Sequence, residues 1–254
     1  MGMTRFEGNV ALVTGAGRGI GRATATRLAR EGATVVVNDV DAAAVADTVA
    51  ALTDEPGTAV AGVADVTDES AINALVARVV ADHGKIDILV NNAGGAMPGS
   101  RWVPVADTTT GEWNSFLALN LTSAFLCARA VIPSMIDGGY GRIVCVNSIS
   151  GENGQRAGAG YAAGKAGLVG LVASLAKELG PHGVAVNGIT VGNAPHPSRT
   201  ADRQELLDEW VHLGRVGSYD EFAAAIAFLC SADASYLSGA FLATDGGFHR
   251  FNML

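Results

Sequence analysis

The segment TGAGRGIG, residues 14–21, is the strongest constraint on the fold, because it joins an apolar stretch to a run of helix formers. The apolar stretch NVALVT, residues 9–14, predicts a buried strand, and residues 19–31 predict a helix. Glycine lets a backbone turn tightly and approach a ligand, and a helix N-terminus offers unpaired N–H groups to an anion. This context favours a dinucleotide phosphate site over a glycine-rich turn without a ligand. The glycines of the segment are Gly15, Gly17, Gly19 and Gly21.

Strand-like and helix-like segments alternate along the whole chain, which predicts βαβ units. We therefore expect an α/β fold: a single domain, 1–254, with a doubly wound parallel sheet of Rossmann type. Helices are expected at 68–83 and 111–137, the second disturbed at Pro133. The remaining strands are expected at 33–38, 58–64, 85–91, 141–147, 184–189 and 240–244.

An irregular stretch follows the sixth strand and predicts a substrate lid over 191–213. Its first part, NAPHPSRTADR, is polar and rich in proline. Its second part becomes amphipathic, with apolar residues at near-helical spacing that are expected to pack on the substrate. These residues are Leu206, Leu207, Trp210 and Leu213.

Charge and composition exclude several classes of function. A net charge of −8 argues against a nucleic-acid partner. The three cysteines lie far apart in apolar surroundings, which predicts buried reduced thiols and no metal site. The N-terminus has no signal-peptide pattern and no apolar run looks long enough to span a bilayer, so we expect a cytoplasmic protein without a membrane partner.

The segment YAAGK places Tyr161 and Lys165 four residues apart. On a helix, both side chains would stand on one face. An ammonium beside a phenol favours the phenolate, so the pair suits general acid–base chemistry near neutral pH. A chance pair on a solvated helix face is the alternative at this point.

Taken together, several motifs resemble those of the short-chain dehydrogenase/reductase family, in its single-domain branch. The motifs are TGxxxGxG at 14–21, NNAG at 91–94, Asn120, Ser148, the Tyr161/Lys165 pair and DGG at 245–247. The resemblance implies that Tyr161 is the general acid/base and that Ser148 polarises the substrate carbonyl. It further implies that Lys165 lowers the pKa of the tyrosine and binds the nicotinamide ribose, while Asn120 holds a water. Ser148 is preferred to Ser150 because it lies 13 residues before Tyr161.

The resemblance also implies a cofactor site and a substrate site. Asp65 is expected at the adenine amino group, with a helix cap near Asp68 as the alternative role. The cofactor-binding residues are expected to be Gly15, Gly17, Arg18, Gly19, Ile20, Gly21, Asp39, Asp65, Val66, Asn92, Ala93, Gly94, Tyr161, Lys165, Gly192 and Ala194. The substrate residues are expected to be Gly95, Ala96, Met97, Glu152, Asn153 and His196. Val191 stands where the family usually has proline, and His196 where it usually has a threonine that contacts the nicotinamide.

The leading hypothesis is an oxidoreductase that moves a hydride between NAD and a secondary alcohol or ketone. Asp39 ends the second strand, where a carboxylate accepts hydrogen bonds from the adenosine ribose, so we expect NAD in preference to NADP, although Arg18 acts in the opposite sense. The runner-up is a 3-oxoacyl-thioester reductase of the acyl-carrier-protein type, which would need a basic patch, for instance around Arg129 or Arg142. A non-catalytic dinucleotide sensor and a sugar-nucleotide epimerase fit less well. The resemblance implies a homotetramer.

Overall fold

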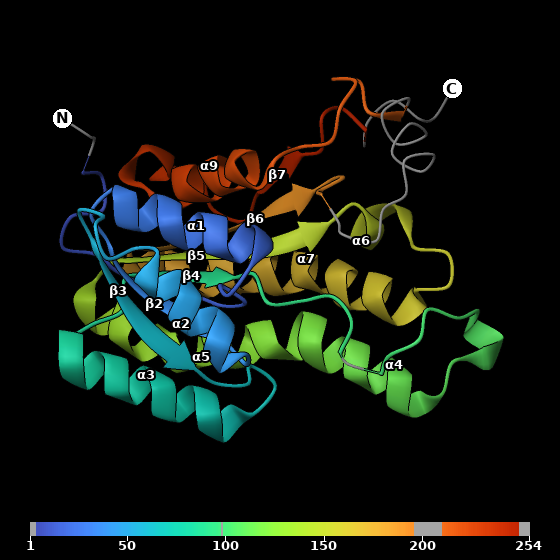
Figure 1. The fold of residues 1–254 in the computed structure, drawn as a ribbon, viewed down its shortest axis with the longest axis horizontal. Helices are drawn as coiled ribbons and strands as arrows, with labels where there is room; N and C mark the ends of the chain where they lie inside the picture. Colours follow the sequence, from blue (N-terminus) through green and yellow to red (C-terminus); the bar gives the residue numbers. More distant parts are fainter. Residues whose placement is uncertain (1–3, 98, 196–209, 249–254) are drawn as a thin grey trace.

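The computed structural model describes residues 4–97, 99–195 and 210–248, and these form one α/β domain around a central sheet (Figure 1). Seven parallel strands lie in the order β3-β2-β1-β4-β5-β6-β7. The order reverses between β1 and β4, which creates the crevice where ligands of such sheets bind. The strands are β1 Val10–Val13, β2 Thr34–Asp39, β3 Thr58–Val63, β4 Ile88–Asn91, β5 Gly141–Ser148, β6 Val184–Val191 and β7 Phe241–Thr244. Each of the seven predicted strands is confirmed.

Helices cover both faces of this sheet (Figure 1). Asp41 and Asp68 cap α2 and α3, and capping boxes open α4 at Thr109 and α9 at Ser218. The helices are α1 Gly19–Arg30, α2 Ala42–Ala50, α3 Glu69–His83, α4 Thr110–Leu117, α5 Ser123–Gly138, α6 Ser150–Asn153, α7 Ala159–Leu179 and α9 Tyr219–Cys230. Short 3₁₀ turns lie at Val105–Asp107, Gly180–His182 and Ala232–Ala234.

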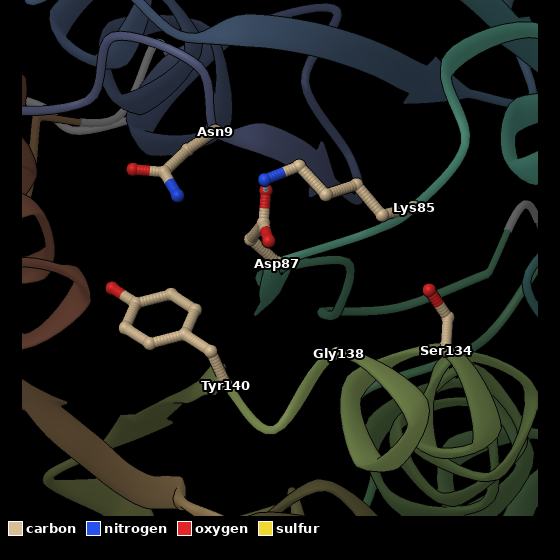
Figure 2. A pocket seen from close by; sticks show the side chains of 6 residues that line it. All are labelled: Asn9, Lys85, Asp87, Ser134, Gly138 and Tyr140. Atoms are coloured by element: carbon tan, nitrogen blue, oxygen red, sulfur yellow. Dashed lines mark ion pairs between the residues drawn. The ribbon is translucent and has the colours of Figure 1, made fainter.

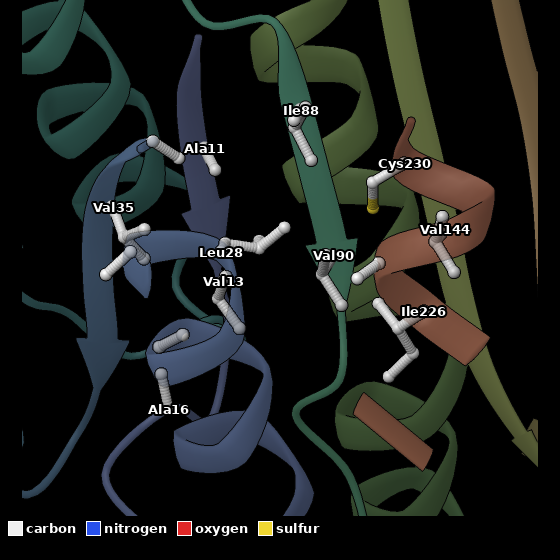
Figure 3. Close-up of a cluster of buried hydrophobic side chains, with 14 of the residues drawn as sticks. Ala11, Val13, Ala16, Leu28, Val35, Ile88, Val90, Val144, Ile226 and Cys230 are labelled. Atoms are coloured by element: carbon white, nitrogen blue, oxygen red, sulfur yellow. The ribbon is translucent and has the colours of Figure 1, made fainter. Parts of the chain in front are cut away.

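Two hydrophobic clusters, one on each face of the sheet, form the core. Along β1, Ala11 and Val13 face the cluster beneath α1 and α9, and Leu12 faces the cluster beneath α3, α5 and α7. Figure 3 shows the first cluster, where Leu28 from α1 and Ile226 from α9 lie on the same side of the strands. Because both faces are covered, the strands are continuous apolar runs, as a buried parallel sheet requires.

The break in the long helical stretch is not at Pro133, which corrects the prediction. Pro133 lies inside α5, while the helix widens into a π turn at Ala118–Thr122. Asn120 is the centre of this turn, and its Nδ2 donates 2.9 Å to the Phe116 carbonyl. Such π turns often mark functional sites. The break therefore places Asn120, rather than the proline, at a special position.

Two helical stretches, Thr110–Gly138 and Ala159–His182, are long and apolar enough to cross a membrane by length and composition alone, contrary to the expectation from the sequence. Both pack on the sheet through one face, with Val131 and Val172 fully buried. They are therefore core helices of the domain. The three cysteines are free and buried, as predicted.

Candidate active site

The glycine loop lies against the chain that leaves β4, and there is no room for a side chain at Gly15 or Gly21. Gly15 has φ +62°, and a Cβ there would lie 3.0 Å from Asn92 Nδ2. A Cβ on Gly21 would lie 2.1 Å from the Gly15 carbonyl oxygen. Both glycines are therefore required by the turn itself, which brings backbone N–H groups and the N-terminus of α1 to the crevice.

A hydrogen-bonded latch holds these two segments together. The Thr14 hydroxyl accepts bonds from the backbone nitrogens of Asn92 and Ala93, each at 3.0 Å, and donates to the Val90 carbonyl at 3.2 Å. Asn92 Nδ2 donates to the carbonyls of Thr14 and Gly15 at 2.8 and 3.1 Å. The sequence motifs named both segments, but not this direct bonding between them.

Asp39 closes the other side of the glycine loop. Its carboxylate is buried at the end of β2 and accepts bonds from the backbone nitrogens of Gly17 and Asp41, both at 3.1 Å. A Cβ on Gly17 would lie 2.9 Å from Asp39 Oδ2, so the glycine lets the carboxylate approach the loop. Arg18, at the N-cap of α1, is exposed. The acidic group is thus fixed and the basic group is free to turn into solvent.

Tyr161 and Lys165 lie on the first turns of α7, next to the end of β5. Lys165 is 5% exposed, and its Nζ donates 2.7 Å to the Val146 carbonyl and lies 6.0 Å from the centre of the Tyr161 ring. Burial lowers the pKa of Lys165 to about 8. Burial also raises the pKa of the Tyr161 phenol above its usual value, while a hydrogen bond with the Ser148 hydroxyl lowers it. Ser148 and Tyr161 are therefore brought together as predicted.

The expected lowering of the tyrosine pKa by Lys165 is corrected by this arrangement. Desolvation dominates at Tyr161, and the opposing contribution comes from Ser148. The lysine is itself so deeply buried that its charged form is disfavoured. With a pKa of about 8, Lys165 is still largely an ammonium at neutral pH, but the contribution that lowers the Tyr161 pKa comes from Ser148.

Asn120 joins α7 to the loop after β4. Its Oδ1 accepts 2.8 Å from the Gly95 nitrogen, and its Nδ2 donates 2.8 Å to the Gly95 carbonyl. A Cβ on Gly94 would lie 2.9 Å from Lys165 Nζ and 3.0 Å from Asn120 Oδ1. The structure thus gathers Gly94, Asn120 and Lys165 in one place, and Asn120 positions the loop. The expected role in holding a water stays a prediction.

The remaining predicted residues border this centre with differing local roles. Asp65 accepts bonds from the Thr67 nitrogen and hydroxyl at 2.8 and 2.7 Å, and Asp68 is the cap of α3, so Asp65 is not the cap. Val66 is buried. A Cβ on Gly192 would lie 2.6 Å from Asp245 Cα, which explains why the 245–247 motif meets the end of β6.

The predicted substrate residues of the described part of the chain lie in the loop after β4 and in α6. Glu152, at α6, accepts 2.7 Å from the Thr190 hydroxyl, and Asn153 follows it. Gly95, Ala96 and Met97 follow β4, and the predicted cofactor residue Ala194 follows β6.

His196 and residues 196–209 of the predicted lid lie outside the described residues. In the described end of that segment, Trp210 and Leu213 are exposed while Val211 is buried, and the packing of Trp210 and Leu213 on the substrate stays a prediction. Val211 packs instead against the 245–247 motif, since a Cβ on Gly246 would lie 2.5 Å from Val211 Cγ1.

Trp102 is a site residue that the sequence did not reveal. Its ring meets Tyr161 edge-on at 5.5 Å between centroids, and Phe116 edge-on at 5.3 Å. It lies in the irregular segment between β4 and α4, where no periodicity or motif marks it. The only available signal was an aromatic residue in a loop that follows the crevice.

A separate hollow of about 240 Å³ lies at the amino ends of β1, β4 and β5, away from this centre (Figure 2). Its two charged side chains neutralise each other, with Lys85 Nζ 3.0 Å from Asp87 Oδ2. That same oxygen accepts 2.8 Å from the Val10 nitrogen. The hollow is a structural feature of the sheet edge. Its lining residues are Asn9, Lys85, Asp87, Ser134, Gly138 and Tyr140.

Comparisons with known proteins agree with this geometry. A family model described as enoyl-(acyl carrier protein) reductase matches residues 15–249. The chain is 39% identical to the cis-4-hydroxycyclohexanecarboxylate dehydrogenase of Sinomonas cyclohexanicum, covering 96% of this chain and 97% of that protein. It is 38% identical to the 3-oxoacyl-(acyl-carrier-protein) reductase of Escherichia coli K12, over 96% and 98% of the two chains. A solved 7α-hydroxysteroid dehydrogenase, complexed with NADH and 7-oxo glycochenodeoxycholic acid, superposes with a TM-score of 0.91 at 34% identity, with 98% of each chain covered.

The buried lysine predicts a pH-dependent stability. Lys165 has a pKa of about 8 when folded and near 10.5 as a free side chain, so the unfolded chain binds more protons between these values. The free energy of unfolding should therefore rise with pH through this window, and the penalty should be complete below pH 8. We expect wild type to gain stability relative to Lys165→Met between about pH 7.5 and 10, measured by denaturant unfolding. A constant difference between the two proteins across this range would contradict the assignment.

Proposed function

The chain belongs to the short-chain dehydrogenase/reductase family, and from this membership we propose an NAD-dependent enzyme that interconverts a secondary alcohol and its ketone, with Tyr161 as the general acid/base. The observation that carries the proposal is the contact of the Ser148 hydroxyl with the partly buried Tyr161 phenol, directly beside Lys165 and the crevice. Family members act as oxidoreductases on small molecules, and this chain is an enzyme of that kind.

The residues of the glycine loop fit a dinucleotide. Two glycines leave space that any Cβ would fill, and the start of α1 provides an anion site. When bound, NAD supplies the hydride acceptor of the reaction. The pyrophosphate would lie on the loop between Gly15 and Gly21, the adenosine ribose at Asp39, and the nicotinamide ribose at Tyr161 and Lys165.

The protein's own residues would then manage the proton. Ser148 would donate a hydrogen bond to the substrate oxygen and orient it towards Tyr161. In alcohol oxidation the Tyr161 oxygen would take the hydroxyl proton, and in ketone reduction it would return one. Asn120 would keep Gly94 and Gly95 in place beside Lys165, so that the nicotinamide side of the crevice has a fixed wall.

The 3-oxoacyl-thioester reductase remains the second candidate, because the reductase of Escherichia coli K12 is 38% identical. Among the described residues, neither Arg129 nor Arg142 provides the basic patch that this alternative would use. Arg142 is 6% exposed and bonds to the carbonyls of Gly141 and Ser231. Arg129 is paired with Glu69 at 2.6 Å. An acidic carrier protein would therefore find little positive charge at either arginine.

The non-catalytic sensor is disfavoured for a different reason. It would need none of the four catalytic side chains, whereas Asn120, Ser148, Tyr161 and Lys165 are all present and gathered at one site.

Tyr161→Phe tests the proposed chemistry. The variant should bind NAD almost normally but lose at least about 100-fold in kcat, because general acid–base groups typically contribute 10²–10⁴-fold. Turnover is measured by NAD reduction across secondary alcohols, cyclic diols, steroids and hydroxyacyl thioesters, and binding by NADH fluorescence. The control variant Tyr140→Phe removes a tyrosine hydroxyl at the opposite end of the strands, and its turnover should match that of wild type. Turnover above about a tenth of wild type in Tyr161→Phe would sink the assignment.

Asp39 leads us to propose NAD in preference to NADP. A 2′-phosphate about 4 Å from the carboxylate would be repelled by on the order of 4 kcal/mol at a dielectric constant near 20, before screening. We expect a higher kcat/KM with NAD than with NADP. Asp39→Asn should lower the ratio of these two kcat/KM values at least tenfold. Asp41→Asn is the matched control, since asparagine also caps α2 well. Equal or better use of NADP by wild type would refute this preference.

We also propose a homotetramer in the cytoplasm. The buried free thiols suit a reducing compartment. Phe125 on α5 and Val169 on α7 expose 43% and 44% of their surface, which suits helix faces that pack against other subunits.

Light scattering at micromolar concentration should therefore give a tetramer mass. The double variant Phe125→Asp/Val169→Asp should lower this mass, because a charge on either helix face would be buried at the subunit contact. Val63→Asp, on edge strand β3, should not lower it. A monomer mass for wild type would be incompatible with the proposed assembly.

A further inference from the structure

We propose that Trp102 is a specificity-determining residue, whose exposed indole surface forms the apolar wall of the substrate site and accepts the hydrocarbon ring of a compact cyclic secondary alcohol. This inference rests on the proposed function, because it places the substrate oxygen at Tyr161. It names a substrate class that the catalytic residues by themselves leave open.

The residue before Trp102 in the sequence, Arg101, anchors this part of the chain. Arg101 forms an ion pair with Glu112 of α4, with Nε 2.6 Å from Oε1, and its Nη2 donates to the Asp107 carbonyl at 3.3 Å. Glu112 is also part of the capping box that opens α4. The residue next to Trp102 is therefore tied to a helix end, and the indole does not lie on a free loop.

The ring is also seated on two buried surfaces. Phe116, 3% exposed, supports it edge-on from α4. A Cβ on Gly158 would lie 2.6 Å from Trp102 Cζ3, so the glycine is the residue that lets the indole lie against the start of α7. Tyr161 stands one turn further along that helix. Phe116, Trp102 and Tyr161 thus form a continuous row of rings from the core to the reactive phenol.

Part of the Trp102 surface is left uncovered by these neighbours. The side chain is 45% exposed although its neighbours cover it on the Phe116 and Gly158 sides. Exposing so much indole beside a catalytic tyrosine is unfavourable unless something apolar covers it. The predicted substrate residues Glu152 and Asn153 are polar. In addition to the apolar Ala96 and Met97 of the predicted site, Trp102 provides a large apolar surface that contacts the Tyr161 ring directly.

This placement separates substrates by the carbons beyond the carbinol. A ring such as cyclohexanol can lay its methylenes on the indole while its hydroxyl meets Tyr161 and Ser148. The small alcohol 2-propanol presents the same reacting group but has no carbons to reach the wall. Each methylene buried in a pocket contributes to substrate discrimination. Removal of the indole should therefore lower kcat/KM for cyclohexanol and leave kcat/KM for 2-propanol almost unchanged.

The experiment measures kcat/KM with NAD for cyclohexanol and 2-propanol in wild type, Trp102→Leu and Trp102→Ala. We expect Trp102→Ala to lose about tenfold or more for cyclohexanol and less than threefold for 2-propanol, and Trp102→Leu to fall between. Tyr236→Ala removes a fully exposed aromatic ring between α9 and β7 and should behave as wild type. NADH binding by fluorescence confirms that each variant is folded.

The outcomes distinguish the two proposals. If wild type oxidises both alcohols but Trp102→Ala loses them equally, or loses neither, the specificity role is overturned while the oxidoreductase function stands. If wild type oxidises neither alcohol, the proposed turnover of simple secondary alcohols fails. The role of Trp102 as the apolar wall is then tested by the binding of cyclohexanol to the NAD-loaded protein, measured by saturation-transfer NMR. Binding that is lost in Trp102→Ala but kept in Tyr236→Ala supports it, and any other binding result overturns it.

Discussion

The close contact between the glycine loop and the chain leaving β4 is the constraint on which the site depends. Thr14 and Asn92 bond the two segments together, and Gly21 admits the Gly15 carbonyl where a side chain would collide. Because β1 and β4 are neighbours at the reversal of strand order, this contact fixes the crevice at the carboxyl edge of the sheet. A change in either segment would alter the phosphate loop and the Gly94–Gly95 loop together.

The second layer of organisation is the π turn at Ala118–Thr122. An ordinary helical turn would keep Asn120 in register with its neighbours, whereas the widened turn directs its amide to both backbone atoms of Gly95. The same asparagine packs under Gly164 of α7, where a Cβ would lie 2.9 Å from Asn120 Cβ. Asn120 therefore connects three elements that come from distant parts of the sequence, and Lys165 is positioned beside it.

The sequence was sufficient to predict the strands and to name the residues that the structure gathers at the candidate site, and the physical reason is visible in each case. Buried parallel strands are uninterrupted apolar runs, so the segments NVALVT and GRIVCVN can be predicted as strands from their composition. The π turn could not be predicted, because its residues have the composition of an ordinary helix and Pro133 offers a stronger, misleading signal. Trp102 was missed because its partners are 14 and 59 residues away and only the folded chain brings them together. The lowering of the Tyr161 pKa was predicted to come from Lys165 but comes from Ser148, because the spacing of residues in a sequence does not show how deeply their side chains are buried.

Burial also links the charge state of the site to the direction of the reaction. It raises the pKa of Tyr161 and lowers that of Lys165, so the protein by itself favours the neutral phenol and weakens the ammonium. A positive charge brought beside the phenol would favour the phenolate, and an oxidised nicotinamide carries such a charge. Under the proposed function, the base needed for alcohol oxidation would then be strongest with oxidised cofactor in place. With a neutral reduced nicotinamide the phenol keeps its proton, which is the form that ketone reduction requires. Under the proposed function, the partly buried Tyr161 beside the buried Lys165 would thus support both directions, with the protonation state following the cofactor.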